Sequence, residues 1–206
     1  LNKFKEKAPD PDIYTDFPRQ DSQSFRGERI HFAFEENLCR KIGRLEEETG
    51  TTLFMVLLAA LNVLLLKYTG CEDIVIGTPV AGRKDPEVEN ILGVFINPLA
   101  LRNRPQKEKT FAEFLSEVKA NTLEAYENQD YPFDDLIEKI DMKRDAGRNP
   151  LFDIDLVLLN MDLPRWEIEG LTIITYEYDS KVTQMDIAFY VSEHETETGT
   201  GTGTGI

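Results

Sequence analysis

Few side chains in this sequence have a type and spacing that could perform catalysis. The two histidines, His31 and His194, have no Ser or Cys at a recognisable nucleophile spacing, and each is most simply interpreted as a surface or strand histidine. The sequence contains no CxxC, HExxH or EF-hand pattern, so it indicates no metal site. Asp153 and Asp155 lie on one face of a predicted strand and could form an acid–base pair, although two solvated carboxylates explain them more simply.

Glycines and arginines at the end of a predicted strand are better candidates for binding. The predicted strand ends in Gly77-Thr78-Pro79, and Gly82-Arg83 follows, so this turn has a flexible backbone and an arginine. Loops at the ends of strands commonly form ligand sites in open α/β sheets. The lysine and glycine spacing of a phosphate-binding loop is missing there. A basic loop over Lys143–Asn149 leads into another strand through Arg148-Asn149-Pro150. On these residues alone, turns whose arginines bond backbone carbonyls are favoured over a ligand site.

Composition excludes some classes of partner. The net charge of −15 argues against nucleic acid and against an anionic membrane surface, because both are bound by clustered Lys and Arg. Two cysteines, Cys39 and Cys71, do not make a disulfide framework and indicate free thiols in a reducing compartment. The apolar run Leu53–Leu66 is shorter than the roughly 20 residues that span a bilayer, so it predicts a buried helix. We therefore expect a soluble cytoplasmic protein.

The elements that must position these residues follow from periodicity and from cap residues. In chain order the sequence predicts a connector over Leu1–Arg29, a strand over Ile30–Phe34, helices over Glu36–Glu48 and from Thr51 or Thr52 to about Tyr68, a strand over Asp73–Pro79, a charged loop over Lys84–Asn90, a strand over Val94–Leu101, a helix capped by Thr110 that runs to about Asn128, a helix over Phe133–Ile140, and strands over Leu151–Leu159, Leu171–Tyr176 and Thr183–Val191. This order predicts a two-layer α/β domain in which helices cover one face of a mixed sheet.

Three local features refine this expectation. Pro98 inside a strand implies a bulge or an edge position, because proline cannot donate to the ladder. Alternation over Leu151–Leu159 predicts that Phe152, Ile154, Leu156 and Leu158 share one face. The Gly-Thr tail over Thr196–Ile206 can bury little and is expected to be a flexible end.

Three stretches in this order resemble a known family. They are DIVIGTPVAGR (Asp73–Arg83) followed by LGVFINPLALR (Leu92–Arg102), NQDYPFD (Asn128–Asp134), and RDAGRNPLFD (Arg144–Asp153). Together they resemble the condensation domain of nonribosomal peptide synthetases, and the similarity covers nearly all of Ile13 to about Val191. The resemblance implies a fold of two lobes, each similar to chloramphenicol acetyltransferase. The family's catalytic motif, HHxxxDG, belongs to the first lobe, and this sequence contains no His-His pair.

The chain therefore resembles the C-terminal, acceptor-side lobe of such a domain. We expect an inter-lobe connector over residues 1–29, the lobe itself over 30–195, and a low-complexity tail over 196–206. The family reaction, part of antibiotic and other secondary-metabolite synthesis, joins an upstream acyl or peptidyl thioester to a downstream aminoacyl thioester. Both are carried on phosphopantetheine arms. The resemblance thus implies as partners the N-terminal lobe, upstream and downstream peptidyl carrier proteins and an adenylation domain, with no cofactor bound directly and no catalytic residue in this chain.

The resemblance also implies roles for individual residues. The residues expected at the substrate tunnel or its floor are Gly77, Thr78, Pro79, Arg83, Asn97 and Arg102. The residues expected to have a structural role are Asp130, Tyr131, Pro132, Phe133, Arg148, Asn149 and Pro150. Asn160–Lys181 matches the part that crosses to the first lobe as a latch.

Some positions depart from the family pattern, and other functions remain open. The family usually has His at Asn128, Thr at Pro98 and Ser at Gly147, and its last strand and C-terminal helix have no counterpart in the sequence of the tail, which leaves a sheet edge uncovered. One alternative is a binding module that docks carrier proteins without chemistry. Another is the lobe of an acyltransferase that uses a coenzyme A thioester, which the stretches NQDYPFD and RNPLF argue against. The same stretches also argue against an epimerisation domain.

Overall fold

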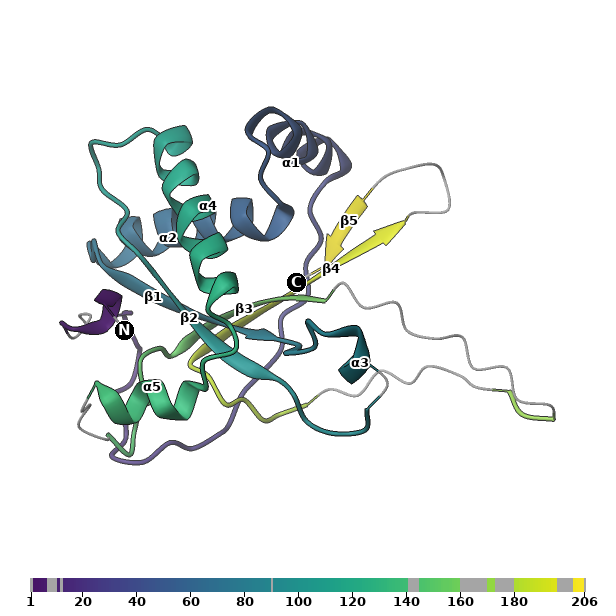
Figure 1. The fold of residues 1–206 in the computed structure, drawn as a ribbon. Helices are drawn as coiled ribbons and strands as arrows, with labels where there is room; N and C mark the ends of the chain where they lie inside the picture. Colours follow the sequence, from purple (N-terminus) through teal and green to yellow (C-terminus); the bar gives the residue numbers. More distant parts are fainter. Residues whose placement is uncertain are drawn as a thin grey trace.

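The computed structural model describes residues 2–6, 11, 13–89, 91–140, 145–159, 170–172, 180–195 and 202–205. Its elements in chain order are a 3₁₀ helix η1 (Asn2–Phe4), α1 (Glu36–Thr49), α2 (Leu53–Thr69), β1 (Ile74–Val80), α3 (Pro86–Glu89), β2 (Asn97–Asn103), α4 (Phe111–Glu127), α5 (Phe133–Lys139), β3 (Ile154–Leu159), β4 (Ile187–Glu195) and β5 (Thr202–Gly205) (Figure 1).

The helix boundaries lie at the cap residues that the sequence indicates. Gly50 and Gly70 end α1 and α2 in the left-handed conformation, with φ of 60° and 72°. The Thr52 side chain accepts a hydrogen bond from the Met55 backbone N–H at the start of α2. Thr110 forms a reciprocal capping box with Glu113 at the start of α4. The predicted positions of these helices are confirmed.

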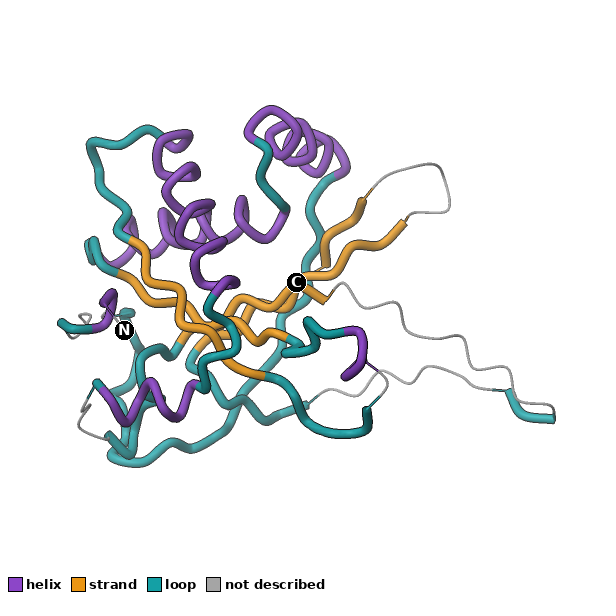
Figure 2. Tube along the Cα trace, in the orientation of Figure 1, coloured by secondary structure: helices purple, strands orange, loops and turns teal. Residues whose placement is uncertain are grey.

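The strands form one mixed sheet in the order β2-β1-β3-β4-β5 (Figure 2). β1 pairs antiparallel with β2 and parallel with β3, and β4 pairs parallel with β3 and antiparallel with β5. β2 is at the edge of the sheet, so the missing N–H of Pro98 interrupts no interior ladder. The edge position predicted from Pro98 is confirmed.

The core lies between the sheet and helices α1, α2 and α4, which Figure 1 shows together on one side of it. α2 supplies Leu58 and α4 supplies Leu115, and both pack in one cluster with Ile76 of β1 and Ile154 of β3. α5 contacts β2 from the opposite side of the sheet. The predicted two-layer α/β architecture is confirmed, with this short helix added on the second face.

One predicted strand is wrong, and part of the tail differs from its prediction. Ile30–Phe34 forms no named strand: Ala33 alone is in a single β-bridge, and Ile30 is 80% exposed. Thr202–Gly205, expected to belong to a flexible end, is β5 and pairs with β4. The ladder bonds of that pairing come from the backbone and do not require large buried side chains. The expected open edge beside β4 is therefore occupied.

Three further predictions differ in extent. The last predicted strand, Thr183–Val191, starts later, at Ile187. The charged loop Lys84–Asn90 contains the short helix α3. Most of the predicted strand Leu171–Tyr176, and most of the expected latch Asn160–Lys181, lies outside the described residues.

The predicted face of Phe152 is also wrong. A Cβ added at Gly77 would lie 2.1 Å from both Phe152 Cε2 and Asp155 Oδ1, so ring and carboxyl share the space beside that glycine. The Phe152 ring centroid is 5.5 Å from that of Phe133 on α5, on the face away from the core helices. β3 begins only at Ile154, and Leu151 has a φ of 69°. Phe152 and Asp153 precede the strand, so the alternation that holds within β3 does not extend back to Phe152.

Candidate functional site

Arg83 holds the loop after β1 together. Its guanidinium donates to the carbonyl oxygens of Val88, of Ile91 at 2.9 Å and of Gly93 at 3.0 Å. The same group lies 4.3 Å from the ring centroid of Phe95. Arg83 thus bonds backbone carbonyls of its own loop, the arrangement that residue chemistry alone favoured.

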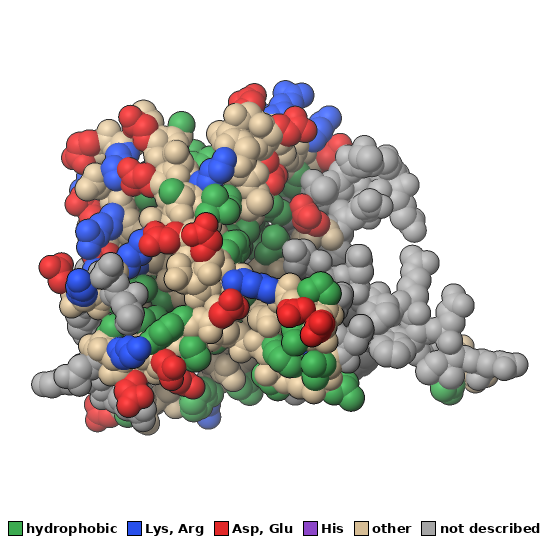
Figure 3. Space-filling model, viewed as in Figure 1, with side chains coloured by type: hydrophobic (Ala, Val, Ile, Leu, Met, Phe, Trp, Pro, Cys, Tyr) green, Lys and Arg blue, Asp and Glu red, His purple; other side chains and the backbone are tan. Residues whose placement is uncertain are grey.

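The same loop exposes an apolar surface that the sequence analysis did not identify. Leu92 is 100% exposed, Val94 is 92% exposed and Ile96 is 63% exposed. Figure 3 shows hydrophobic side chains gathered near α3. We call residues 91–96 the apolar loop. Its sequence looked like the start of a strand, but β2 begins only at Asn97.

Asn97 joins β2 to the bend between α4 and α5. Its side-chain N–H₂ donates to the carbonyls of Gln129 at 2.8 Å and Tyr131 at 2.9 Å. Its side-chain oxygen accepts from the Phe133 backbone N–H at 3.1 Å. Two of the sequence motifs, the one containing Asn97 and the one from Asn128 to Asp134, therefore meet in space through a single amide whose donors are both used.

Arg102 lies at the opposite end of the same strand. β1 and β2 pair Val80 with Asn97 and Val75 with Arg102. Asn97 and Arg102 are five residues apart on β2, which is about 17 Å at the usual strand rise. The Arg102 side chain is 5% exposed and makes two hydrogen bonds to Asp73, at 2.7 and 2.6 Å. The six residues expected at the tunnel floor therefore do not form one cluster, because Arg102 stands apart from the others.

The surroundings of Arg102 are structural in character. Its remaining nitrogen donates to the backbone oxygens of Lys3 at 2.5 Å and Glu6 at 2.8 Å, so the pair ties the first residues to the sheet. Burial acts to raise the pKa of Asp73, but the hydrogen bonds and charges of Arg102 and Arg104 outweigh it and hold that pKa below its ordinary value.

The three remaining expected floor residues differ in exposure. Gly77 and Thr78 are buried, and Pro79 at the end of β1 is exposed. Gly77 is opposite Asp155 in the parallel pairing of β1 with β3. Burial raises the pKa of the Asp155 carboxyl from its ordinary 3.8 to about 6.

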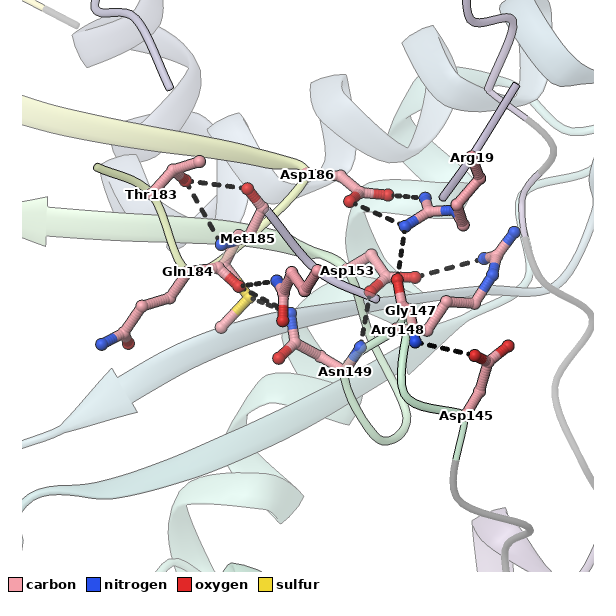
Figure 4. Close-up of polar contacts among 11 residues, drawn as sticks. Arg19, Asp145, Gly147, Arg148, Asn149, Asp153, Thr183, Gln184, Met185 and Asp186 are labelled. Carbon is pink, nitrogen blue, oxygen red and sulfur yellow. Dashed lines mark hydrogen bonds and ion pairs between the residues drawn. The ribbon is translucent and has the colours of Figure 1, made fainter. Parts of the chain in front are cut away.

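The loop before β3 is fixed by Asp153 (Figure 4). This carboxylate accepts from the Asn149 backbone N–H at 2.9 Å and from Arg148 at 3.2 Å. The Asn149 side chain donates to the Gln184 carbonyl at 2.7 Å, ahead of β4. Burial raises the pKa of Asp153, the Asn149 hydrogen bond opposes that rise, and the charge of Asp186 adds to it. The motif thus joins the starts of β3 and β4.

The connector closes over this junction, which the sequence analysis did not foresee. Both terminal nitrogens of Arg19 donate to the Asp186 carboxylate, and one also donates to the Gly147 carbonyl at 2.9 Å. Gln23 donates to the Gln184 carbonyl at 2.7 Å. Between the connector and the strand starts is a cavity of about 580 Å³. Arg19 and Asp186 line this cavity, but they are paired with each other. Their ion pair therefore holds the connector in place and is not evidence of a ligand site.

The described residues contain no group of three or more His, Cys, Asp and Glu side chains that could hold a metal ion. Within the same part of the chain, no single helix has the length and apolarity needed to cross a membrane. Only the pair α1 and α2 meets those criteria jointly, and it is bent by 106°.

Sequence comparison identifies the family. Residues 1–199 match the Condensation domain. Tyrocidine synthase 3 of Brevibacillus parabrevis is 51% identical over 193 residues, which are 94% of this chain and 3% of that protein. Bacitracin synthase 3 of Bacillus licheniformis is 46% identical over 196 residues, which are 95% of this chain and 3% of that protein. The chain thus spans a small part of the length of these relatives.

Solved structures share the fold. The X-domain from teicoplanin biosynthesis superposes with a TM-score of 0.91 at 21% identity, over 99% of this chain and 46% of that one. A four-domain nonribosomal peptide synthetase, holo-AB3403 bound to AMP and glycine, superposes with a TM-score of 0.81 at 26% identity, over 99% of this chain and 16% of that one. Fold, motifs and sequence identity agree, and the chain belongs to the condensation domain family of nonribosomal peptide synthetases.

Proposed function

We propose that this chain is the C-terminal, acceptor-side lobe of a peptide-bond-forming condensation domain. The observation that carries the proposal is the family match over residues 1–199, in a sequence without the His-His pair of the catalytic motif. The relatives are synthases of tyrocidine and bacitracin, which supports a role in making a peptide product. The reaction takes place in the cytoplasm, which the two free cysteines favour.

The lobe forms one wall of the tunnel in which the two thioesters meet. The acceptor amine attacks the donor carbonyl, a C–N bond forms, the C–S bond breaks, and the thiol of the donor arm leaves. The HHxxxDG lobe supplies the histidine beside the amine, and this chain supplies positioning, which accelerates a bimolecular step by holding its reactants in line. The substrates arrive on phosphopantetheine arms of carrier proteins loaded by an adenylation domain, so the chain itself binds no cofactor.

The exposed surface around the loop that connects β1 to β2 is the part of this lobe that contacts its partners. Pro79 and the apolar loop lie there, and the loop's exposed Leu92 and Val94 give a surface suited to contact with another protein. Arg83 and Asn97 act behind this surface by fixing its backbone. We assign Arg102 to stability, because both sides of its guanidinium are occupied by the chain's own groups.

The second and third motifs hold the lobe together. Tyr131, Pro132 and Phe133 form the bend that receives Asn97, and Asp130 pairs with Lys84 at 2.9 Å. Arg148, Asn149 and Pro150 shape the junction of β3 and β4. These contacts support a structural role for both motifs.

A binding module without chemistry is the second candidate. The fold also occurs in an X-domain that was solved in complex with OxyB, so a protein of this shape can bind another protein. Such a module would bind a carrier protein tightly with no first lobe present.

Reconstitution separates the two. The chain is combined with an HHxxxDG lobe and two loaded carrier proteins, and mass spectrometry follows the dipeptidyl thioester on the acceptor arm. The proposal predicts product from the pair and none from either lobe alone. A stable pair that forms no product while the isolated chain binds carrier protein would favour the binding module instead.

A further inference from the structure

One carboxyl group in the middle of the sheet has a buried oxygen that accepts no hydrogen bond from the described residues. Asp155 is on β3, opposite Gly77 of β1 and Ala188 of β4. Its neighbours Ile154 and Leu156 belong to the core beneath the helices. Because side chains alternate along a strand, Asp155 projects from the other face of the sheet, the one on which α5 and the connector lie (Figure 1).

The space for this carboxyl is provided by a missing side chain. Any Cβ at Gly77 would overlap both Asp155 Oδ1 and the Phe152 ring, at 2.1 Å from each. Oδ1 is fully covered and accepts no hydrogen bond from the described residues. Asp155 as a whole is only partly buried, so part of the residue reaches the surface. A partly desolvated carboxylate without a donor costs free energy, so a retained one points to a ligand.

The charged groups around Asp155 are engaged elsewhere. Just before β3, Asp153 forms an ion pair with Arg148, and just before β4, Asp186 forms an ion pair with Arg19. Burial is the sole cause of the raised pKa of Asp155, and about 6 still leaves the group mostly ionised at neutral pH. Among the described residues no cation forms an ion pair with Asp155, which is therefore a partly buried anion without a compensating charge.

We propose that Asp155 binds the ammonium group of the acceptor aminoacyl substrate. The inference rests on the proposed function, because Gly77 is among the residues expected at the tunnel floor. Of the groups that this reaction brings together, the thioesters are neutral and the phosphate of the carrier arm is an anion, whereas the acceptor amine is a cation when protonated. The Phe152 ring and the sheet exclude water from one side of the carboxylate, which strengthens the ion pair.

The test measures binding in the reconstituted pair of lobes. The probe is an aminoacyl-pantetheine amide, a stable analogue with a free ammonium group, and its N-acetylated form is the neutral counterpart. Asp155→Asn removes the charge with little change of shape. Glu47→Gln is the matched control, because Glu47 is exposed near the end of α1 and loses the same charge. Affinities are measured by titration calorimetry at pH 7.5 and at pH 5.

We expect Asp155→Asn to weaken binding of the amine probe at pH 7.5 by roughly tenfold, the loss of one charge-assisted hydrogen bond. Glu47→Gln should bind like the unsubstituted chain, and the N-acetylated probe should not distinguish the variants. Protonation of Asp155 should weaken amine binding similarly at pH 5. Equal affinities of Asp155→Asn and the unsubstituted chain, or no binding of the amine probe to either, would overturn the proposal. Amide formation by the pair would show in either case that the proposed function stands.

Discussion

The substitution Asp155→Asn makes a pH-dependent prediction about stability. Folding raises the pKa of this carboxyl from 3.8 to about 6, so the folded state holds its proton over a range in which the unfolded state has released it. The unfolded chain therefore binds fewer protons between these values, and this group lowers the stability of the protein as the pH rises from about 4 to about 6. Asparagine has no charge to desolvate. The variant should match the unsubstituted protein below pH 4 and exceed it above pH 6.

The size of the effect follows from the two pKa values. A factor of ten in proton affinity is about 1.4 kcal/mol, so the separation between 3.8 and about 6 is worth at most roughly 3 kcal/mol. Asp155 is only partly buried, so solvent screens the cost of its charge, and we halve the figure to about 1–2 kcal/mol at pH 7.5. For a chain of 206 residues this raises the unfolding midpoint by about 2–8 °C.

Urea unfolding of both proteins between pH 4 and pH 8 measures the difference. The free energy of unfolding of Asp155→Asn should rise above that of the unsubstituted chain across this range and level off near pH 7. Glu47→Gln should show no such trend. A difference that is constant with pH, or an Asp155→Asn variant that is the less stable one at pH 7.5, would refute the reasoning.

Three other substitutions test the contacts that hold the motifs. Arg102→Ala should lower the free energy of unfolding in urea by about 3 kcal/mol, because it leaves the mostly buried Asp73 carboxylate without its bidentate partner. Arg104→Ala, on the exposed side of that carboxylate, should lower it by under about 1 kcal/mol, and equal losses would contradict this. Gly77→Ala should lower the free energy of unfolding by about 1–3 kcal/mol, whereas Gly43→Ala, whose added methyl group contacts no neighbouring side chain, should raise it by about 0.5–1 kcal/mol. An unchanged free energy for Gly77→Ala would show that the surrounding side chains move aside. Asn97→Asp should cost about 2 kcal/mol in thermal unfolding at pH 7, because a carboxylate cannot donate to two carbonyls; an unchanged midpoint would remove Asn97 from its role.

Local chemistry explains what could be predicted from the sequence. The two helix-ending glycines, Gly50 and Gly70, adopt the left-handed conformation, and the two helix-starting threonines, Thr52 and Thr110, accept hydrogen bonds with their side-chain oxygens. Both effects depend on the residue itself and can be predicted without knowing the rest of the chain. Pro98 likewise indicates an edge strand, because proline has no backbone N–H to donate to a neighbouring strand. The order of the motifs then gave the family.

Contacts between distant segments explain what could not be predicted. Arg102 and Asp73 are part of recognisable strands, but their bonds to Lys3 and Glu6 depend on where the first residues lie. The ion pair between Arg19 and Asp186 joins segments that are 167 residues apart in the sequence. The face of Phe152 depends on where β3 begins, at Ile154, and the unbroken alternation over Leu151–Leu159 does not reveal that boundary.

The placement of the acceptor arm tests the central claim most directly. Pro79→Cys, at the exposed end of β1, and Glu47→Cys, on α1, are each introduced with Cys71→Ser to remove the half-buried thiol. Each variant is paired with the HHxxxDG lobe and exposed to an acceptor carrier protein whose phosphopantetheine arm ends in a bromoacetyl group. The account predicts that the arm couples to the cysteine at position 79 and leaves the one at position 47 unmodified. Equal coupling at both positions, or none at position 79 in a pair that forms product, would contradict the claim that this lobe forms the acceptor-side wall.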